Sequence, residues 1–345
     1  MKILYASGLS PNDSSLYRLW ALERLGHQVI PLNFFDYLPR NPLLDKIVFR
    51  LAAGPHVNRL NRDLLDIAQR EKPDLLWADK LLWMKPSTLD GLRALGIATV
   101  SYMIDNPFGT RQDPGWRLYM KCIPRYDLHV VQRDKNIADY RARGARDVIK
   151  IQTAFEPTLH FPPSATWSDK DRDRDVSFIG TPYDDRAQTL VRLAQLNEFG
   201  VTISGGQRVW QRALSPADLA ALYREGELHQ EKYREAIWRS KINLSFITHS
   251  NQDEFVHKSF EIAGCGGFLL AERSQGHLDR FREDEEAVFF SNFDELARKI
   301  RRYLPDEAAR TRIAAAGHAR AHRDGYYNDR QVALILDRVH TLMES

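Results

Sequence analysis

The chain has 345 residues, of which 43% are hydrophobic, and its formal net charge is +3 at pH 7. This length and apolar content suit two globular domains of about 150 residues each, and the small charge excludes a dedicated nucleic-acid-binding protein, which carries a strong basic footprint. The two cysteines, Cys122 and Cys265, exclude a disulfide framework, and no stretch approaches the roughly 20 apolar residues of a membrane span. The sequence begins directly with a strand pattern and not with the apolar segment of a signal peptide, so we expect a cytoplasmic protein.

The first half of the chain alternates short apolar runs with helical patterns. Between the first two runs, Leu16, Leu19, Trp20 and Leu25 form a helical stripe that ends at Gly26. The predicted strands are residues 2–7, 27–32, 74–79, 97–105, 127–132 and 147–152. Nearly continuous apolar strands separated by helices predict a parallel sheet with helices on both faces.

A change in composition divides the chain. Residues 156–175 contain prolines followed by a charge run without an apolar period, which is typical of a linker. The strand pattern then resumes at residues 175–180, 200–206, 241–247, 267–272 and 287–290. Helical patterns fill the rest of the chain, apart from a break at 322–329. We therefore expect an α/β protein with two parallel-sheet domains facing a cleft, at 1–155 and 176–325, joined by the linker.

Residues 257–272, HKSFEIAGCGGFLLAE, carry the most informative pattern. Lys258 and Glu261 lie on a short predicted helix, and a glycine turn that includes Gly266 and Gly267 leads from it into a buried strand. A lysine pairs well with phosphate, an ionised glutamate can accept hydrogen bonds from two hydroxyls, and glycines let backbone approach a ligand closely. In open α/β sheets ligands bind at the carboxyl ends of strands. These residues therefore predict a site for a nucleotide, alone or joined to a sugar.

Two further acidic residues precede Lys258. Asp253 is a candidate N-cap of the predicted helix, and Glu254, Lys258 and Glu261 are spaced to share one helical face. The alternative interpretation is an exposed, helix-stabilising Glu–Lys pattern, which is common.

A second cluster opens the C-terminal half at residues 178–186, FIGTPYDDR. A strand ends at Gly180, a polar turn follows, and Arg186 lies near the start of the next helix, which together predict a phosphate-binding pocket. The stretch does not satisfy GxGxxG and no GxxxxGK[ST] occurs, so a nicotinamide or flavin cofactor and a P-loop are disfavoured.

The N-terminal half offers polar residues at two strand ends. Asp105 follows a buried strand and can contact the donor sugar or an acceptor hydroxyl, and Asn106 precedes Pro107 in a turn. An Asx-type turn cap is the alternative interpretation of Asp105. Ser7 and Gly8 follow the first strand and are expected to face the same cleft.

Arginines accumulate at residues 45–70 and 111–146, beside Phe49, Trp116 and Tyr119. Weak contact with a membrane surface is one interpretation of this pattern. Acidic residues interleave with the arginines, which favours ordinary solvated helix faces.

From residue 241 to about 322 the chain resembles the C-terminal domain of GT-B glycosyltransferases, in particular the CgeB-like branch within the glycosyltransferase group 1 type. The resemblance rests on Lys258, Phe260-Glu261-Ile262, Cys265-Gly266 and Phe268-Leu269-Leu270, and on the downstream stretches GHLDRFREDEEAVFFSNFDELARKIRRYL and RIAAAGHARAHRDGYYNDR. Retaining GT-B families carry two acidic residues with seven between them. Asp253 and Glu261 fit this spacing, with aspartate where glutamate is usual.

The resemblance implies a GT-B fold of two Rossmann-like domains, whose C-terminal helix, at about 326–345, crosses back to the first domain. It implies that the C-terminal domain binds an NDP-sugar donor and the N-terminal domain an acceptor, which the sequence leaves unidentified. Glu261 would hold the donor ribose and Lys258 the diphosphate, with Gly180 and Arg186 in the phosphate pocket. Transfer is then expected to be retaining and independent of metal, with the NDP-sugar as co-substrate and no tightly bound cofactor, since a cation that faces the leaving diphosphate stabilises the charge that develops there.

Two other functions fit the same scaffold. An NDP-sugar epimerase would use carboxylates beside the donor and need no acceptor pocket. A non-catalytic protein would bind the sugar nucleotide without turnover.

Overall fold

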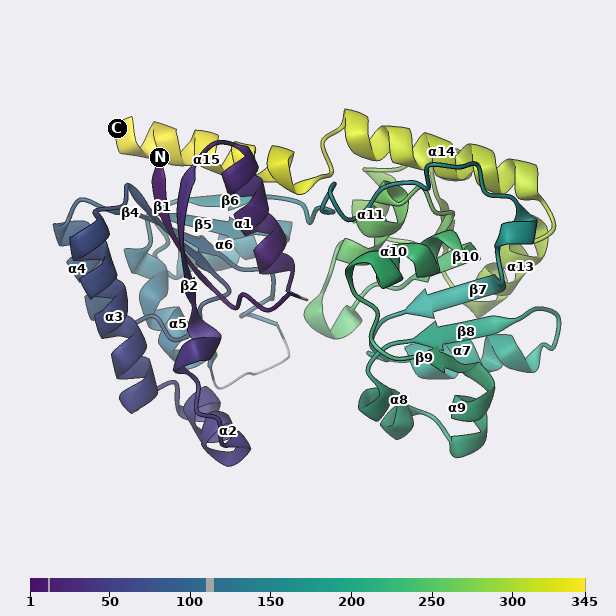
Figure 1. Cartoon of the computed structure of the whole chain (residues 1–345), viewed down its shortest axis with the longest axis horizontal. Helices are drawn as coiled ribbons and strands as arrows, with labels where there is room; N and C mark the ends of the chain where they lie inside the picture. Colours follow the sequence, from purple (N-terminus) through teal and green to yellow (C-terminus); the bar gives the residue numbers. More distant parts are fainter. Residues whose placement is uncertain (12, 110–114, 345) are drawn as a thin grey trace. The chain divides into compact units, whose positions relative to one another are not determined.

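The computed structural model describes residues 1–11, 13–109 and 115–344. The chain forms two compact units (Figure 1): unit 1 comprises residues 1–152 and 328–345, and unit 2 comprises residues 153–327. The chain therefore passes from unit 1 to unit 2 after Gln152 and returns after Tyr327.

Unit 1 is built on a six-stranded parallel sheet in the order β2-β1-β3-β4-β5-β6. Its strands are β1 (Lys2–Ser7), β2 (Gln28–Asn33), β3 (Leu75–Asp79), β4 (Ala98–Tyr102), β5 (Leu128–Val131) and β6 (Val148–Lys150). Its α-helices are α1 (Ser14–Arg24), α2 (Pro42–Leu51), α3 (Pro55–Glu71), α4 (Pro86–Ala94), α5 (Trp116–Cys122), α6 (Asp134–Ala142) and α15 (Asn328–Glu344). Two 3-10 helices, η1 (Phe34–Tyr37) and η2 (Ile123–Arg125), complete it.

Unit 2 holds a second six-stranded parallel sheet in the order β12-β11-β10-β7-β8-β9. Its strands are β7 (Arg174–Ile179), β8 (Val201–Ser204), β9 (Tyr223–Glu225), β10 (Ser240–Ser245), β11 (Leu269–Glu272) and β12 (Val288–Phe290). Its α-helices are α7 (Arg186–Gln195), α8 (Gln207–Ala213), α9 (Pro216–Leu222), α10 (Gln230–Trp238), α11 (His257–Gly264), α12 (Gln275–Leu278), α13 (Phe293–Tyr303) and α14 (Glu307–Arg323). Two 3-10 helices are η3 (Asp169–Asp171) and η4 (His249–Asn251).

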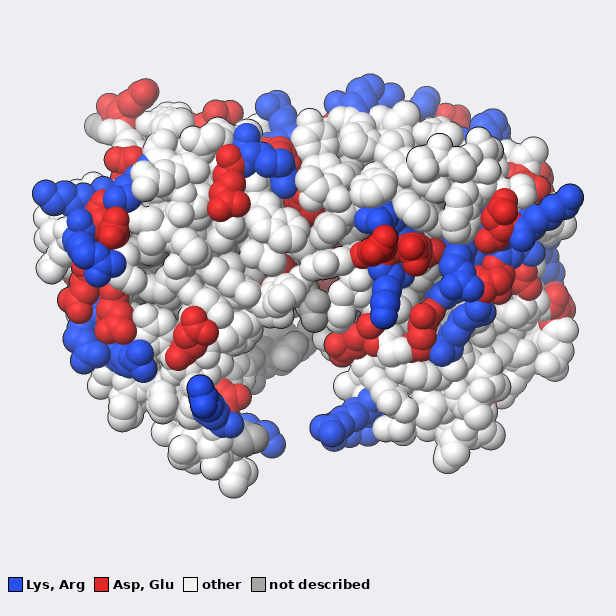
Figure 2. Space-filling model, viewed as in Figure 1, with Lys and Arg blue, Asp and Glu red and all other residues white. Residues whose placement is uncertain are grey.

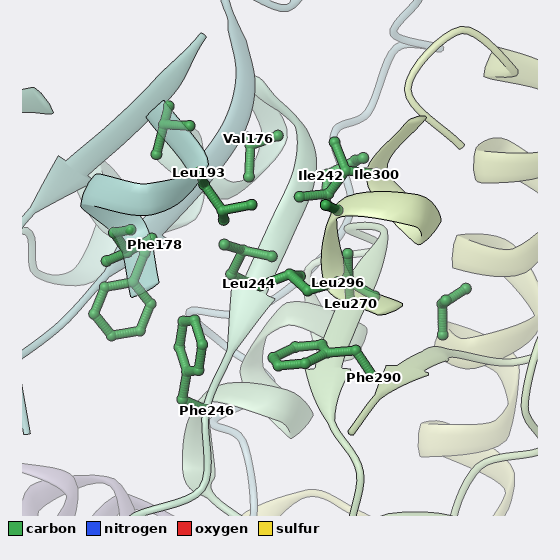
Figure 3. Close-up of a cluster of buried hydrophobic side chains, with 14 of the residues drawn as sticks. Val176, Phe178, Leu193, Ile242, Leu244, Phe246, Leu270, Phe290, Leu296 and Ile300 are labelled. Carbon is green, nitrogen blue, oxygen red and sulfur yellow. The ribbon is translucent and has the colours of Figure 1, made fainter. Parts of the chain in front are cut away.

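Both faces of each sheet are covered, which is why the strands read as nearly continuous apolar runs. In unit 2, Val176, Ile242 and Leu270 point to one face, where Leu193 of α7 and Ile300 of α13 pack on them (Figure 3). The intervening strand residues point to the other face, where α10 and α11 cover them. The predicted two-sheet α/β architecture is confirmed. The short edge strand β9 is absent from the sequence prediction.

The last helix packs on unit 1, as the resemblance implies. Ile335 and Val339 of α15 share a buried cluster with Leu19 and Leu22 of α1. An ion pair of 2.6 Å between Arg24 and Asp329 joins the two helices.

Residues 156–175 differ from the free linker that their composition indicates. They belong to unit 2, where Glu156 and His160 are buried and Asp169 forms an ion pair with Arg310 of α14. The neighbouring Phe155 is fully buried against α11. The prolines and charges of this segment are therefore folded onto the unit.

Candidate active site

The order of strands in unit 2 creates a place for a ligand. β7 and β10 are neighbours, and the chain leads from β7 toward β8 and β9 on one side, and from β10 toward β11 and β12 on the other. At such a switch point the loops leave in opposite directions and open a crevice at the carboxyl ends of the strands. The loop after β7, the loop after β10 and the first turn of α11 lie at this edge.

Lys258 and Glu261 meet around the side chain of Tyr233, which α10 supplies. The Tyr233 hydroxyl donates to Glu261 Oε2 at 2.8 Å and lies 3.2 Å from Lys258 Nζ. Lys258 Nζ also lies 4.9 Å from the centre of the Tyr233 ring. Lys258 forms no ion pair with any residue that the structure describes, and none of those residues donates a hydrogen bond to Glu261 Oε1. The pair therefore offers a cation and a carboxylate oxygen to a ligand.

The charges of this pair are tuned by burial and by each other. Burial, opposed by the charge of Glu261 and assisted by the charge of Arg186, lowers the pKa of Lys258 to about 8. Burial alone would raise the pKa of Glu261, but the charges of His160 and Lys258 and the Tyr233 hydrogen bond outweigh it, so this pKa lies below its usual value. Glu261 is thus ionised at neutral pH, and a bound anion would stabilise the charged form of Lys258.

Gly180 lies directly beside Lys258. A Cβ atom built on Gly180 would come within 3.4 Å of Lys258 Cε, so the lysine side chain runs along this glycine. The Gly180 carbonyl accepts a hydrogen bond from Trp210 Nε1 at 2.9 Å. At Gly205, after β8, a Cβ atom would lie 2.2 Å from the Gly180 carbonyl oxygen, so only glycine fits there. The loop after β7 is therefore tightly held at the site.

Arg186 is buried and bound to backbone carbonyls. Its guanidinium donates to the carbonyl oxygens of Thr181, Phe246 and Ile247 at 3.0 to 3.2 Å, and to Thr248 Oγ1 at 2.9 Å. Arg186 thus joins the loop after β7 to the loop after β10. Because its guanidinium is bonded to these loops, we expect it to contribute positive charge to the predicted phosphate pocket and not a direct contact.

Glu272, at the end of β11, is a site residue that the sequence analysis missed. Its Oε2 accepts from the backbone N–H of Ile247 at 3.0 Å, and its Oε1 lies 2.6 Å from His249 Nε2. Glu272 therefore fixes the same loop that Arg186 binds. An acidic residue that ends a buried strand was the available signal, the same signal that drew attention to Asp105.

The structure corrects the predicted start of the helix. α11 begins at His257 with Val256 as its N-cap, so Asp253 is not the cap and Glu254 lies outside the helix. Asp253 Oδ1 instead accepts from Asn251 Nδ2 at 2.9 Å. The predicted shared face is therefore reduced to Lys258 and Glu261.

Gly266 and Gly267 lie at the other end of α11, at the amino end of β11. Gly266 has φ +66°, and its N–H donates to the carbonyl of Ala263 as the helix ends. A Cβ atom on Gly267 would lie 2.6 Å from Ile237 Cγ2. These glycines serve chain reversal and close packing, and the structure does not bring them together with Lys258.

Unit 1 has its own crevice at the corresponding place, where β1 and β3 are neighbours. A cavity of about 360 Å³ lies there, lined by Ser7 and Gly8 after β1 and by Asp79 and Lys80 at the end of β3. Arg18 also lines it. The Arg18 guanidinium binds the buried Asp79 carboxylate at 2.5 and 3.0 Å. The predicted residues Ser7 and Gly8 thus belong to a real pocket of unit 1.

Apolar side chains also contribute to the cavity wall. It is lined by Phe34, Phe35, Leu38, Phe49, Leu82 and Trp83. A Cβ atom on Gly8 would lie 2.7 Å from the Phe35 ring, so glycine is what lets this ring approach the first strand. The lining of the pocket therefore combines charged and aromatic residues.

Asp105 and Asn106 have different roles. The Asp105 carboxylate is half-buried and lies 2.7 Å from Lys80 Nζ. The turn is closed by Asn106, whose Oδ1 accepts from the N–H of Phe108 at 3.0 Å and from Asn136 Nδ2 at 2.8 Å. The Asx turn is thus made by Asn106, and Asp105 is joined to the pocket through its ion pair with Lys80.

Two of the aromatic residues named with the basic segments do not face the solvent. Trp116 and Tyr119 are buried, and residues 111–114 of that prediction lie outside the described residues. Within residues 1–11, 13–109 and 115–344, no helix is long and apolar enough to cross a membrane. The same residues contain no group of three or more His, Cys, Asp or Glu side chains arranged to hold a metal ion.

Comparison with known families places this edge of unit 2 in a functional class. Residues 186–337 match the model of a family described as glycosyl transferase-like. This segment is a glycosyl transferase-like domain. No curated protein sequence matches the chain.

Solved structures share the fold of the whole chain. Sucrose-phosphate synthase from Thermosynechococcus elongatus has a TM-score of 0.70 at 13% identity, with 99% of this chain and 98% of that one covered. Anabaena HepE in complex with UDP-glucose has a TM-score of 0.67 at 14% identity, with 98% and 100% covered. A glycosyltransferase from Rickettsia africae has a TM-score of 0.68 at 12% identity, with 100% and 99% covered. The chain thus has a GT-B-like fold.

The glycosyl transferase-like segment contains most of the site in unit 2. Arg186, Tyr233, Lys258, Glu261 and Glu272 all lie within residues 186–337. Gly180 precedes the segment, and the pocket of unit 1 lies outside it. The crevice of unit 2 is therefore supported by sequence similarity to the glycosyl transferase-like family, whereas the pocket of unit 1 is supported by similarity of fold alone.

Proposed function

We propose that the protein is a glycosyltransferase that moves a sugar from a nucleoside-diphosphate sugar to an acceptor. The observation that carries this proposal is the Lys258–Tyr233–Glu261 arrangement within the glycosyl transferase-like segment. It combines a half-buried cation that has no ion-pair partner among the described residues with an ionised carboxylate, at the edge of the sheet where α/β proteins bind nucleotides.

Each group has a distinct part in donor binding. Glu261 accepts hydrogen bonds from the two ribose hydroxyls, because its Oε1 has no hydrogen bond from any described residue and its pKa favours the ionised form. Lys258 pairs with the diphosphate. Gly180 leaves room for the phosphate next to the lysine stem, and Arg186 adds positive charge from within the loop.

The same cation assists the reaction. During transfer, the bond between the anomeric carbon and the β-phosphate oxygen breaks, a bond from that carbon to the acceptor oxygen forms, and the acceptor hydroxyl loses its proton. Negative charge grows on the β-phosphate as the bond breaks. Lys258, fixed by Tyr233, stabilises that charge more in the transition state than in the ground state. In this scheme transfer needs no metal.

Unit 1 binds the acceptor in the pocket at the ends of β1 and β3. Its charged lining residues Asp79 and Lys80 orient the acceptor hydroxyls, and Asp105 acts beside them through its ion pair with Lys80. We further propose that transfer retains the anomeric configuration, in line with the seven-residue interval between Asp253 and Glu261. Proton NMR of the product's anomeric signal tests this point.

UDP-glucose is the first donor to test, because HepE, which shares the fold, was crystallised with it. Release of UDP is measured for the wild type and for Lys258→Ala and Glu261→Ala, and UDP affinity is measured by calorimetry. Glu261→Ala is expected to weaken UDP binding by about 1.5 to 3 kcal/mol, and Lys258→Ala to lower kcat more than it weakens binding of the nucleoside part.

The outcomes separate the functions. Release of free UDP that depends on an added acceptor supports transfer. Isomerisation of the sugar without release supports an epimerase, and tight binding of UDP-sugars without turnover supports a non-catalytic protein. Unchanged UDP affinity in a folded Glu261→Ala variant would remove the assignment of the donor site.

A further inference from the structure

Helix α2 of unit 1 exposes an apolar face. The side chains of Leu43, Leu44, Ile47 and Leu51 are 70%, 50%, 50% and 67% exposed. At 3.6 residues per turn these four positions fall within about 100° of the helix circumference. We call them the α2 apolar face. Large aliphatic side chains clustered in this way on a surface indicate a partner.

Cations border this face. Lys46 and Arg50 are exposed and lie next to it around the helix, and Arg40 is exposed just before the helix. The only carboxylate of α2, Asp45, is half-buried and lines the pocket on the inner side of the helix. In Figure 2 the part of unit 1 that carries α2 is mostly white, with blue groups and a red one at its border. An apolar face edged by lysine and arginine complements an anionic lipid surface.

The inner side of the same helix belongs to the unit 1 pocket. Phe49 lines the cavity together with Trp83 and Phe35, and Phe35 is itself 43% exposed. Phe49 and Trp83 meet edge-to-face with 6.5 Å between ring centres. Helix α2 therefore contributes Phe49 to the pocket on its inner side and carries the α2 apolar face on its outer side.

We propose that unit 1 docks onto an anionic lipid bilayer through the α2 apolar face. The helix lies in the plane of the interface, with its four aliphatic side chains among the acyl chains and Lys46 and Arg50 at the headgroups. Because α2 also contributes Phe49 to the unit 1 pocket, docking holds this pocket within about one helix diameter of the headgroups, and the acceptor is then a lipid that carries a hydroxyl; this last step rests on the proposed function.

The test uses the full chain and two kinds of vesicle, of phosphatidylcholine alone and of phosphatidylcholine mixed with phosphatidylglycerol. Co-sedimentation is expected with the mixed vesicles, weaker at high salt and weaker on phosphatidylcholine alone. Replacing Ile47 and Leu51 by glutamate is expected to lower the partition coefficient more than about tenfold. A variant with Lys46 and Arg50 changed to glutamine is expected to lose the preference for the anionic vesicles.

Leu95→Glu is the matched control, because Leu95 is 44% exposed at the end of α4 and is not part of the face. It is expected to bind vesicles as the wild type does. Absence of vesicle binding, or binding that the Ile47→Glu, Leu51→Glu variant leaves unchanged, would overturn the proposal. So would a concentration-dependent dimer that this variant dissociates, since a second copy would then be the occupant.

Failure of the proposed function is separable from this result. Vesicle binding needs no nucleotide, and UDP affinity measured without vesicles reports on unit 2 alone. The Ile47→Glu, Leu51→Glu variant is expected to keep the wild-type UDP affinity and thermal midpoint, which also shows that it folds. If the wild type binds vesicles and not UDP, the donor site is wrong and the docking surface stands.

Discussion

The Tyr233 hydroxyl donates a hydrogen bond of 2.8 Å to Glu261 Oε2. The bond ties α10 to α11 and holds the carboxylate in one orientation beside Lys258. Tyr233 is buried, so the orientation is maintained by packing as well as by the bond.

Tyr233→Phe is therefore expected to weaken nucleotide binding. Loss of one hydrogen bond to a charged group costs about 1.5 to 3 kcal/mol, which is a loss of affinity of about tenfold or more. Calorimetry with UDP measures it. Tyr303→Phe, which removes a similar 2.8 Å bond to Asp284 at the end of α13, is the control and is expected to bind normally. Equal affinities in the two variants would show that Tyr233 does not position Glu261.

The lowered pKa of Lys258 predicts a pH dependence of donor binding. With a pKa of about 8, the lysine is an ammonium ion at pH 7 and loses its proton as the pH rises through 8. A diphosphate prefers the ammonium form, so UDP affinity is expected to be highest below pH 8 and to fall above it, with proton uptake on binding near pH 8.

Two variants isolate this effect. Lys258→Arg keeps its charge throughout this range and is expected to flatten the fall between pH 7 and 9. Lys258→Met is expected to bind weakly at all pH values. If the fall persists in Lys258→Met, another group is responsible.

The buried guanidinium of Arg186 predicts a structural role. Arg186→Met removes its bonds to three backbone carbonyls and to Thr248, and leaves the carbonyls after β10 without partners. The free energy of unfolding of unit 2 is expected to fall by about 2 kcal/mol or more. Denaturant unfolding followed by tryptophan fluorescence measures it. Arg208→Met, at an exposed position, is the control, and an equal effect of the two changes would contradict the role.

The buried ion pair of unit 1 makes a parallel prediction. Asp79→Ala leaves the Arg18 guanidinium buried without its carboxylate, which costs about 3 to 5 kcal/mol. A lower thermal midpoint is expected, and Asp90→Ala, whose partner Arg125 is exposed, is expected to have little effect. A folded Asp79→Ala variant with an unchanged midpoint would show that the pair contributes little to stability.

Much of the fold could be predicted from the sequence, because the alternation of apolar runs with helical stripes is a local property. All strands that the structure describes were expected except β9, whose three residues at the sheet edge have no apolar run to reveal them. Lys258 and Glu261 could also be found, since their spacing on a short helix between two strands is visible in the chain. That Gly266 and Gly267 lie away from Lys258, at the amino end of β11, could not be predicted, because a glycine turn has the same sequence at either end of a sheet.

The partners of the site residues were decided by the tertiary structure. Tyr233 lies 25 residues from Lys258, and Arg186 reaches carbonyls 60 residues away, because the strand order sets β10 beside β7. The sequence alone shows which residues are polar and which strands they follow. Lys258 has no ion pair among the described residues, whereas Arg186 is bound to backbone carbonyls. This difference depends on burial and on neighbours that only the folded sheet brings together.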